Sequence, residues 1–161
     1  MSAFGATKKL LIGIGNYGRS DDALGWKFAD AVAEGSHGFR YDIEYRYQLQ
    51  IEDALLVSEY DEVIFVDASH TQYENGYSFY ESEPKQVTNF TTHSLPPEAI
   101  LWLVSRLYNK KPRAFVMAIT GVNWDLRHGL SMDAQVNLSK ALDYFNQREP
   151  TYGASVLSKG T

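Results

Sequence analysis

Three short runs of consecutive apolar residues divide the chain, and each predicts a strand that is buried on both faces. They lie at 9–14, 63–66 and 114–119. Runs of this kind are typical of strands in a parallel sheet that helices cover on both sides. Two further segments, 41–49 and 77–83, alternate between apolar or aromatic and polar residues. Alternation predicts half-buried strands, and we expect 41–49 to lie near an edge of the sheet.

Apolar residues at helical spacing occupy the intervals between these strands. They predict four helices, at 20–34, 52–60, 96–107 and 131–145. We expect Ser20 or Asp21 to cap the first helix and Gly35 to end it. Strands that alternate with helices predict an α/β sandwich built on a mostly parallel sheet. The chain is expected to form one domain over 1–161, in which about 150–161 is a flexible tail.

Composition narrows the classes of function that this fold could carry. The 161 residues have a formal net charge of −5, so we expect no nucleic-acid partner. There are no cysteines, which removes disulfides, thiolate metal sites and cysteine nucleophiles and fits a reducing compartment. No stretch of the sequence resembles a signal peptide or a membrane span. We therefore expect a cytoplasmic protein that does not contact membranes.

The glycine-rich turn after the first strand allows a dinucleotide-binding interpretation. Its Gly-x-Gly-x-x-Gly sequence at 13–18 matches the fingerprint that cradles a pyrophosphate. Two features argue against it. Asp21 and Asp22 would place negative charge at the helix start, where a phosphate needs a positive field. The second predicted strand also ends without the acidic residue that binds the ribose. A dinucleotide-binding oxidoreductase domain remains the alternative.

A second interpretation of the same turn is a metal site. Ligands of open α/β sheets lie beyond the carboxyl ends of the strands. Asp22 follows the first strand, Asp67 ends the second apolar strand, and His93 precedes the helix at 96–107. Two carboxylates and one imidazole could bind a divalent metal and leave positions open for water or substrate. Carboxylates in loops also cap helices or face water, and His70 is either a fourth ligand or a solvated side chain.

Several segments together resemble the NiFe-hydrogenase maturation endopeptidases. Leu-x-Gly-Ile-Gly-Asn at 11–16 and Ser-Asp-Asp-Ala-Leu-Gly at 20–25 resemble the N-terminal signature of that family. The strand at 63–68 that ends in Asp-Ala, the Thr-His-Ser-Leu segment at 92–95 and the Gly-Val to Leu-Ser segment at 121–131 are similar to later parts of its pattern. The resemblance covers most of the chain. Many family members have Glu at the position of Asp22.

The resemblance implies an enzyme as well as a fold. Family members remove a C-terminal extension from the hydrogenase large-subunit precursor after nickel insertion. It implies a five-stranded twisted sheet between two layers of helices, and a metal-dependent endopeptidase in which Asp22, Asp67 and His93 contact the metal. That metal would be the nickel ion carried by the precursor, although another divalent metal would suit the same ligands. A non-proteolytic relative that binds the precursor or the metal is a further alternative.

Overall fold

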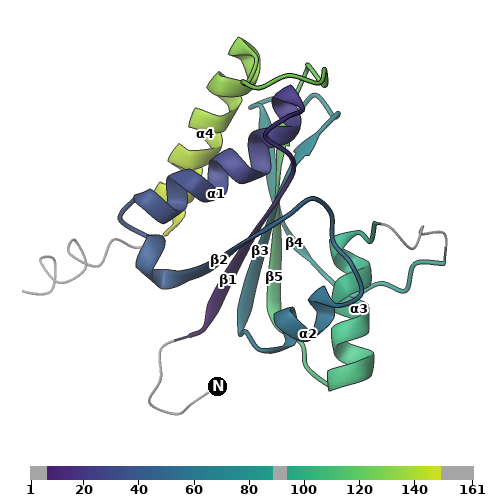
Figure 1. Ribbon diagram of the computed structural model, residues 1–161. Coiled ribbons are helices and arrows are strands. Elements are labelled where there is room, and N and C mark those ends of the chain that lie inside the picture. The colour runs from purple at the N-terminus through teal and green to yellow at the C-terminus, as the bar shows by residue number, and fades with distance from the viewer. Residues whose placement is uncertain (1–6, 89–93, 150–161) are drawn as a thin grey trace, which may run out of the picture.

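The computed structural model describes residues 7–88 and 94–149, and within them five strands form one sheet in the order β2-β1-β3-β5-β4 (Figure 1). The strands are β1 (Lys9–Ile14), β2 (Tyr41–Arg46), β3 (Glu62–Ser69), β4 (Tyr77–Ser82) and β5 (Arg113–Thr120). β2, β1, β3 and β5 are parallel, and β4 runs antiparallel along β5. The predicted five-stranded, mostly parallel sheet is confirmed, with β2 at one edge.

Helices cover both faces of the sheet and complete a three-layer α/β fold (Figure 1). The helices are the short 3-10 helices η1 (Ser20–Ala23) and η2 (Gly38–Arg40) and the α-helices α1 (Leu24–Glu34), α2 (Asp53–Ser58), α3 (Pro97–Tyr108) and α4 (Met132–Arg148). Leu10 and Ile12 of β1 face α2 and α3, whereas Leu11 faces α1 and α4. Both faces of β1 are therefore buried, and for this reason its sequence is apolar from Leu10 to Ile14.

The two strands that differ most in length from their predictions are β2 and β3, and both differ because of what they contact. β2 ends at Arg46, and the chain then turns so that the Leu49 carbonyl accepts a hydrogen bond of 3.1 Å from the Leu95 amide. β3 continues two residues beyond Asp67 because its pairing with β5 extends to Ser69. Asp67 therefore lies within the paired part of the strand. The predicted tail at 150–161 lies outside the described residues.

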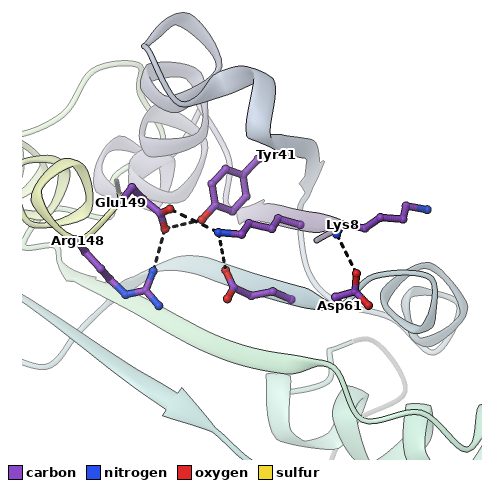
Figure 2. Close-up of polar contacts among 7 residues, drawn as sticks. Lys8, Tyr41, Asp61, Arg148 and Glu149 are labelled. Carbon is purple, nitrogen blue, oxygen red and sulfur yellow. Dashed lines mark hydrogen bonds and ion pairs between the residues drawn. The ribbon is translucent and has the colours of Figure 1, made fainter. Parts of the chain in front are cut away.

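Charged side chains join the end of α4 to the amino ends of the strands (Figure 2). The buried carboxylate of Glu149 accepts hydrogen bonds from the Tyr41 hydroxyl at 2.6 Å and from Nη1 of Arg148 at 2.8 Å. Nζ of Lys9 lies 3.7 Å from Glu149 and 3.8 Å from Glu62. We call these five residues the amino-edge cluster.

Among the helices in the described ranges, none has the length and apolar character that a membrane span requires.

Candidate functional site

The order of the strands creates a crevice between the carboxyl ends of β1 and β3. The chain leaves β1 toward β2 on one side and then crosses back to β3 on the other side. Ligand sites of open α/β sheets form at such switch points, because the connections diverge there. Asp22 lies in η1, directly after the β1 turn, and Asp67 lies near the end of β3. The topology therefore brings two of the predicted metal ligands to one edge of the sheet.

Glycines allow the first turn of α1 to rest directly on the strand ends. A Cβ atom on Gly25 would lie 2.2 Å from the carbonyl oxygen of Ile14 and 2.5 Å from that of Val66. Both contacts involve backbone that cannot move aside cheaply. A Cβ atom on Gly15 would likewise lie 2.1 Å from the carbonyl oxygen of Asp22. Close packing at these glycines fixes the position of Asp22 relative to β1 and β3.

The backbone amides of the glycine-rich turn are engaged within the protein, which argues against a pyrophosphate site. A phosphate cradle needs such amides to point toward the ligand. Seven amides between residues 15 and 22 donate instead to protein oxygens: those of Gly15, Asn16, Gly18, Arg19, Ser20, Asp21 and Asp22. The acceptors include carbonyls of the segment 123–127, which lies over the start of η1. These contacts disfavour the dinucleotide-binding alternative.

Asp21 is buried and holds the loop at 121–131, which we call the late loop. Its carboxylate accepts hydrogen bonds from the amides of Val122 at 2.8 Å and Asn123 at 2.9 Å. It also accepts from the amide of Ser131 at 2.8 Å and from the Ser131 hydroxyl at 2.7 Å. Burial alone would raise the pKa of Asp21, but these hydrogen bonds together lower the pKa below its usual value.

The capping role predicted for Ser20 or Asp21 is therefore wrong. Neither η1 nor α1 has a side-chain cap. The hydroxyl of Ser20 donates to the carbonyl of Asp125 at 2.9 Å, and the carboxylate of Asp21 binds the late loop as described. Both side chains are directed toward partners about a hundred residues further along the chain. The 3-10 geometry of η1 turns them away from the amides of α1.

Asp22 and Asp67 line one cavity at the switch point, which we call the Asp22–Asp67 cavity. Its volume is about 440 Å³, and both carboxylates are partly exposed to it. Within the described residues neither carboxylate takes part in an ion pair. The lining consists of Ile14, Asp22, Tyr47, Gln48, Leu49, Asp67, Ser94, Leu95, Pro96 and Pro97.

The electrostatics of this pair disfavour two negative charges. Burial and then the charge of Asp22 raise the pKa of Asp67 to about 7, although the Ala68 amide opposes the shift. Burial also raises the pKa of Asp22, while the positive charges of Arg19 and His70 act in the opposite direction. Two like charges that face one cavity, with no ion-pair partner among the described residues, provide a site where a divalent cation would be stabilised.

The third predicted ligand, His93, lies outside the described residues. Ser94, the next residue in sequence, lines the Asp22–Asp67 cavity just before α3. Among the residues that the structure describes, no group of three histidine, aspartate or glutamate side chains is placed to hold a metal. The structure thus brings Asp22 and Asp67 together, and the metal role of the three residues stays a prediction.

His70 is exposed and stacks on the late loop. Its ring centroid lies 4.0 Å from that of Trp124, with 32° between the ring planes. The positive charge of His70 acts to lower the pKa of Asp22. Sequence reasoning left His70 open and missed Tyr47 and Gln48 as cavity residues. The only signal for Tyr47 was its place at the end of the alternating segment 41–49.

Comparisons with known proteins identify the fold. No protein-family model and no curated protein sequence matches the chain. The hydrogenase maturating endopeptidase HybD from Escherichia coli superposes with a TM-score of 0.67 at 16% identity, over 86% of this chain and 89% of that one. The NiFe hydrogenase maturation protease HycI from Thermococcus kodakarensis gives 0.66 at 20% identity, over 89% and 93%. A hydrogenase 2 maturation peptidase from a Thaumarchaeota archaeon gives 0.63 at 17%, over 87% and 96%.

Proposed function

We propose that this chain is a hydrogenase maturation endopeptidase that removes a C-terminal extension from a NiFe-hydrogenase large-subunit precursor after nickel insertion. The observation that carries the proposal is the pair Asp22 and Asp67, which face one cavity at the switch point without an ion-pair partner in the described residues. The solved structures with this fold and these names support the same conclusion. The enzyme would act in the cytoplasm on a protein partner.

The donor set fits a divalent cation. Carboxylate oxygens from Asp22 and Asp67 with an imidazole nitrogen from His93 would satisfy three positions and leave others for water or substrate. The nickel ion arrives with the precursor, and when bound it would polarise the scissile carbonyl and lower the pKa of a water molecule. Asp67 must lose its proton to bind the cation, because burial raises its pKa to about 7. Asp67 or a further water would then accept the proton of the attacking water.

The experiment compares cleavage of a nickel-loaded precursor by the wild type and by three variants. Asp22→Ala, Asp67→Ala and His93→Ala should each abolish release of the extension, as measured by mass spectrometry of the intact precursor. Asp143→Ala, which changes an exposed carboxylate of α4, is the matched control and should cleave like the wild type. Circular dichroism checks that all four variants are folded.

Four outcomes would contradict or redirect the proposal. Wild-type cleavage by any of the three alanine variants would remove that residue from the site. Equal cleavage of precursor with and without nickel would exclude a role for the ion. Specific binding of the precursor without cleavage by the wild type would indicate the non-proteolytic alternative, and thermal stabilisation by NAD would revive the dinucleotide alternative.

A further inference from the structure

Four aromatic side chains form a rigid surface between α1 and the edge strand β2. The ring of Trp26 lies 4.8 Å from that of Tyr17, 5.8 Å from Tyr45 and 5.1 Å from Tyr47. Nε1 of Trp26 donates to the Arg46 carbonyl at 2.9 Å, which fixes the indole. We call Tyr17, Trp26, Tyr45 and Tyr47 the aromatic platform. Tyr47 is 70% exposed and Tyr45 is 36% exposed, so the platform presents ring surface to solvent.

Hydrogen bonds hold the platform in place. The hydroxyls of Tyr17 and Tyr45 both donate to the carboxylate of Asp30, each at 2.6 Å. A single exposed aromatic residue needs no explanation, but a fixed group of them is typical of a binding surface. Because hydrogen bonds hold the side chains of Tyr17, Trp26 and Tyr45, a ligand that stacks on the platform loses little entropy from these three side chains.

A second cavity of about 520 Å³ lies against this platform and borders the candidate site. Its lining is Trp26, Tyr45, Arg46, Tyr47, Gln48, Gln50, Glu52 and Asp53. Tyr47 and Gln48 also line the Asp22–Asp67 cavity, so the two cavities share a wall. We call the two adjacent cavities the groove. It runs from Asp22 and Asp67, past the shared residues Tyr47 and Gln48, and over the segment after β2. An extended polypeptide whose scissile bond lay between Asp22 and Asp67 would continue along this groove.

The groove carries excess negative charge. Arg46 is the only basic residue in the described lining of either cavity, and its Nε lies 2.9 Å from the Asp53 carboxylate. Nη2 of Arg46 lies 3.7 Å from Glu44, so carboxylates of the protein already neutralise the charge of Arg46. Glu52 is exposed beside the platform, and Asp22 and Asp67 lie at the other end. Aromatic faces next to a carboxylate favour a cationic side chain.

We propose that the aromatic platform and Glu52 form a subsite for a lysine or arginine side chain of the precursor, several residues from the scissile bond. This proposal rests on the proposed function, because it takes the precursor as the occupant of the groove. The cationic side chain would stack on Tyr47 and Trp26 and lie near Glu52. The subsite would select precursors by charge, at a distance from the bond that is cleaved.

The first test is a binding experiment that needs no catalysis. The indole N–H signal of Trp26 in an NMR spectrum reports directly on the groove, because Trp26 lines it. The probes are two blocked pentapeptides of three glycines each, one with two arginines and one with two glutamates. The arginine peptide should shift the signal in a saturable way and the glutamate peptide should not. The affinity should fall when the ionic strength rises from about 0.05 M to about 0.5 M.

Variants test whether the arginine peptide binds at the aromatic platform. Tyr47→Ala and Glu52→Lys should each weaken arginine-peptide binding by roughly three- to tenfold. Phe39→Ala and Glu59→Lys are the matched controls, since both residues are exposed and lie toward the amino ends of the strands, before β2 and after α2. Equal shifts from both peptides, no shift from either, or equal losses in variants and controls would overturn the proposal.

Cleavage kinetics separate this subsite from the proposed activity. With nickel-loaded precursor, Glu52→Lys should raise KM by roughly three- to tenfold and leave kcat unchanged, because Glu52 is remote from the reacting bond. A lower kcat with unchanged KM would overturn the assignment. If the wild type binds the arginine peptide but cleaves no precursor, the proposed function fails and the charge preference of the groove stands. If it cleaves the precursor but binds both peptides equally, only the subsite fails.

Discussion

A pair of carboxylates lies near each end of the strands, and the two pairs differ in the partners that the protein gives them. We call the two ends the amino edge and the carboxyl edge. At the amino edge, Glu149 and Glu62 are matched by Lys9, Arg148 and the Tyr41 hydroxyl (Figure 2). At the carboxyl edge, Asp22 and Asp67 share a cavity with no ion pair in the described part of the chain. At the first pair the protein supplies the positive charge itself, although Oε2 of Glu62 has no hydrogen-bond partner in the described residues. Within the described residues the second pair has no ion-pair partner, and a bound cation would supply one.

The same contrast occurs between two adjacent residues. Asp21 accepts four hydrogen bonds from the late loop, and its pKa is lowered. Asp22, the next residue, faces the cavity, and burial raises its pKa. The 3-10 turn of η1 directs one carboxylate inward and the other toward the switch point. Of these two adjacent carboxylates, Asp21 therefore has a structural role and Asp22 has a candidate binding role.

The largest expected effect is on cleavage. Asp67→Asn should lower kcat/KM for nickel-loaded precursor by a factor of about 1,000, because an amide binds a divalent cation more weakly and cannot accept the water proton. The free energy of unfolding in urea at neutral pH should not fall, since the variant removes a half-buried charge that has no ion-pair partner. A large loss of stability would show that Asp67 is a structural carboxylate like those of the amino edge.

The opposite result is expected at the amino edge. Glu149→Gln should lower the free energy of unfolding by about 3 kcal/mol, because it leaves Arg148 and Lys9 without their buried partner. Cleavage by the folded variant should be unchanged. Urea denaturation gives the stability, and Asp143→Asn on the exposed face of α4 is the control. Stability equal to that of the control would mean that the amino-edge cluster contributes nothing.

A smaller loss is expected from Asp21→Asn. The side-chain amide would direct its own N–H donors at donors of the late loop and should cost about 2 kcal/mol. Since the folded pKa of Asp21 is lowered, its stabilisation is present above its ordinary pKa and is lost as the pH falls through the folded value. Asp22→Asn is the matched comparison and should cost no stability. If both variants behave alike in urea, the contrast between the two carboxylates is wrong.

The smallest expected effect, at most about 1.4 kcal/mol per unit of pH, is a dependence of stability on pH. Asp67 has its pKa raised from 3.8 to about 7, so between these values the folded state holds a proton that the unfolded state has lost. The free energy of unfolding should therefore decrease as the pH rises through this window and become level above it. Urea unfolding of the wild type minus Asp67→Asn isolates this slope. A difference that does not vary with pH would show that the pKa of Asp67 is not raised.

Most of the framework could be predicted from local pattern. Apolar runs locate β1, β3 and β5 because strands covered on both faces need apolar side chains in succession. The rule that ligands lie at the carboxyl ends of strands placed Asp22 and Asp67 at one edge. The order of the strands and the antiparallel direction of β4 have no such local signal, since they depend on contacts between segments far apart in sequence.

The details of the site depend on contacts that local rules do not see. The capping rule examines only the amides that follow a residue, whereas Asp21 binds amides of residues 122, 123 and 131. Tyr47 was expected inside a strand, but β2 ends one residue earlier and Tyr47 lies in the turn that lines the cavities. In both cases the contacts of the residue depend on a segment that is distant in sequence and packs against it.

The hydrogen bonds of Asp21 also limit when during synthesis the site can be complete. Until residues 122 and 123 have left the ribosome the carboxylate has none of its four hydrogen bonds, and until residue 131 follows it has at most two. Burying the carboxylate unpaired would cost several kcal/mol. A nascent chain that already contains Asp22 and Asp67 therefore cannot hold η1 in its final place. The N-terminal half carries both carboxylates, but the late loop decides when they face a finished cavity.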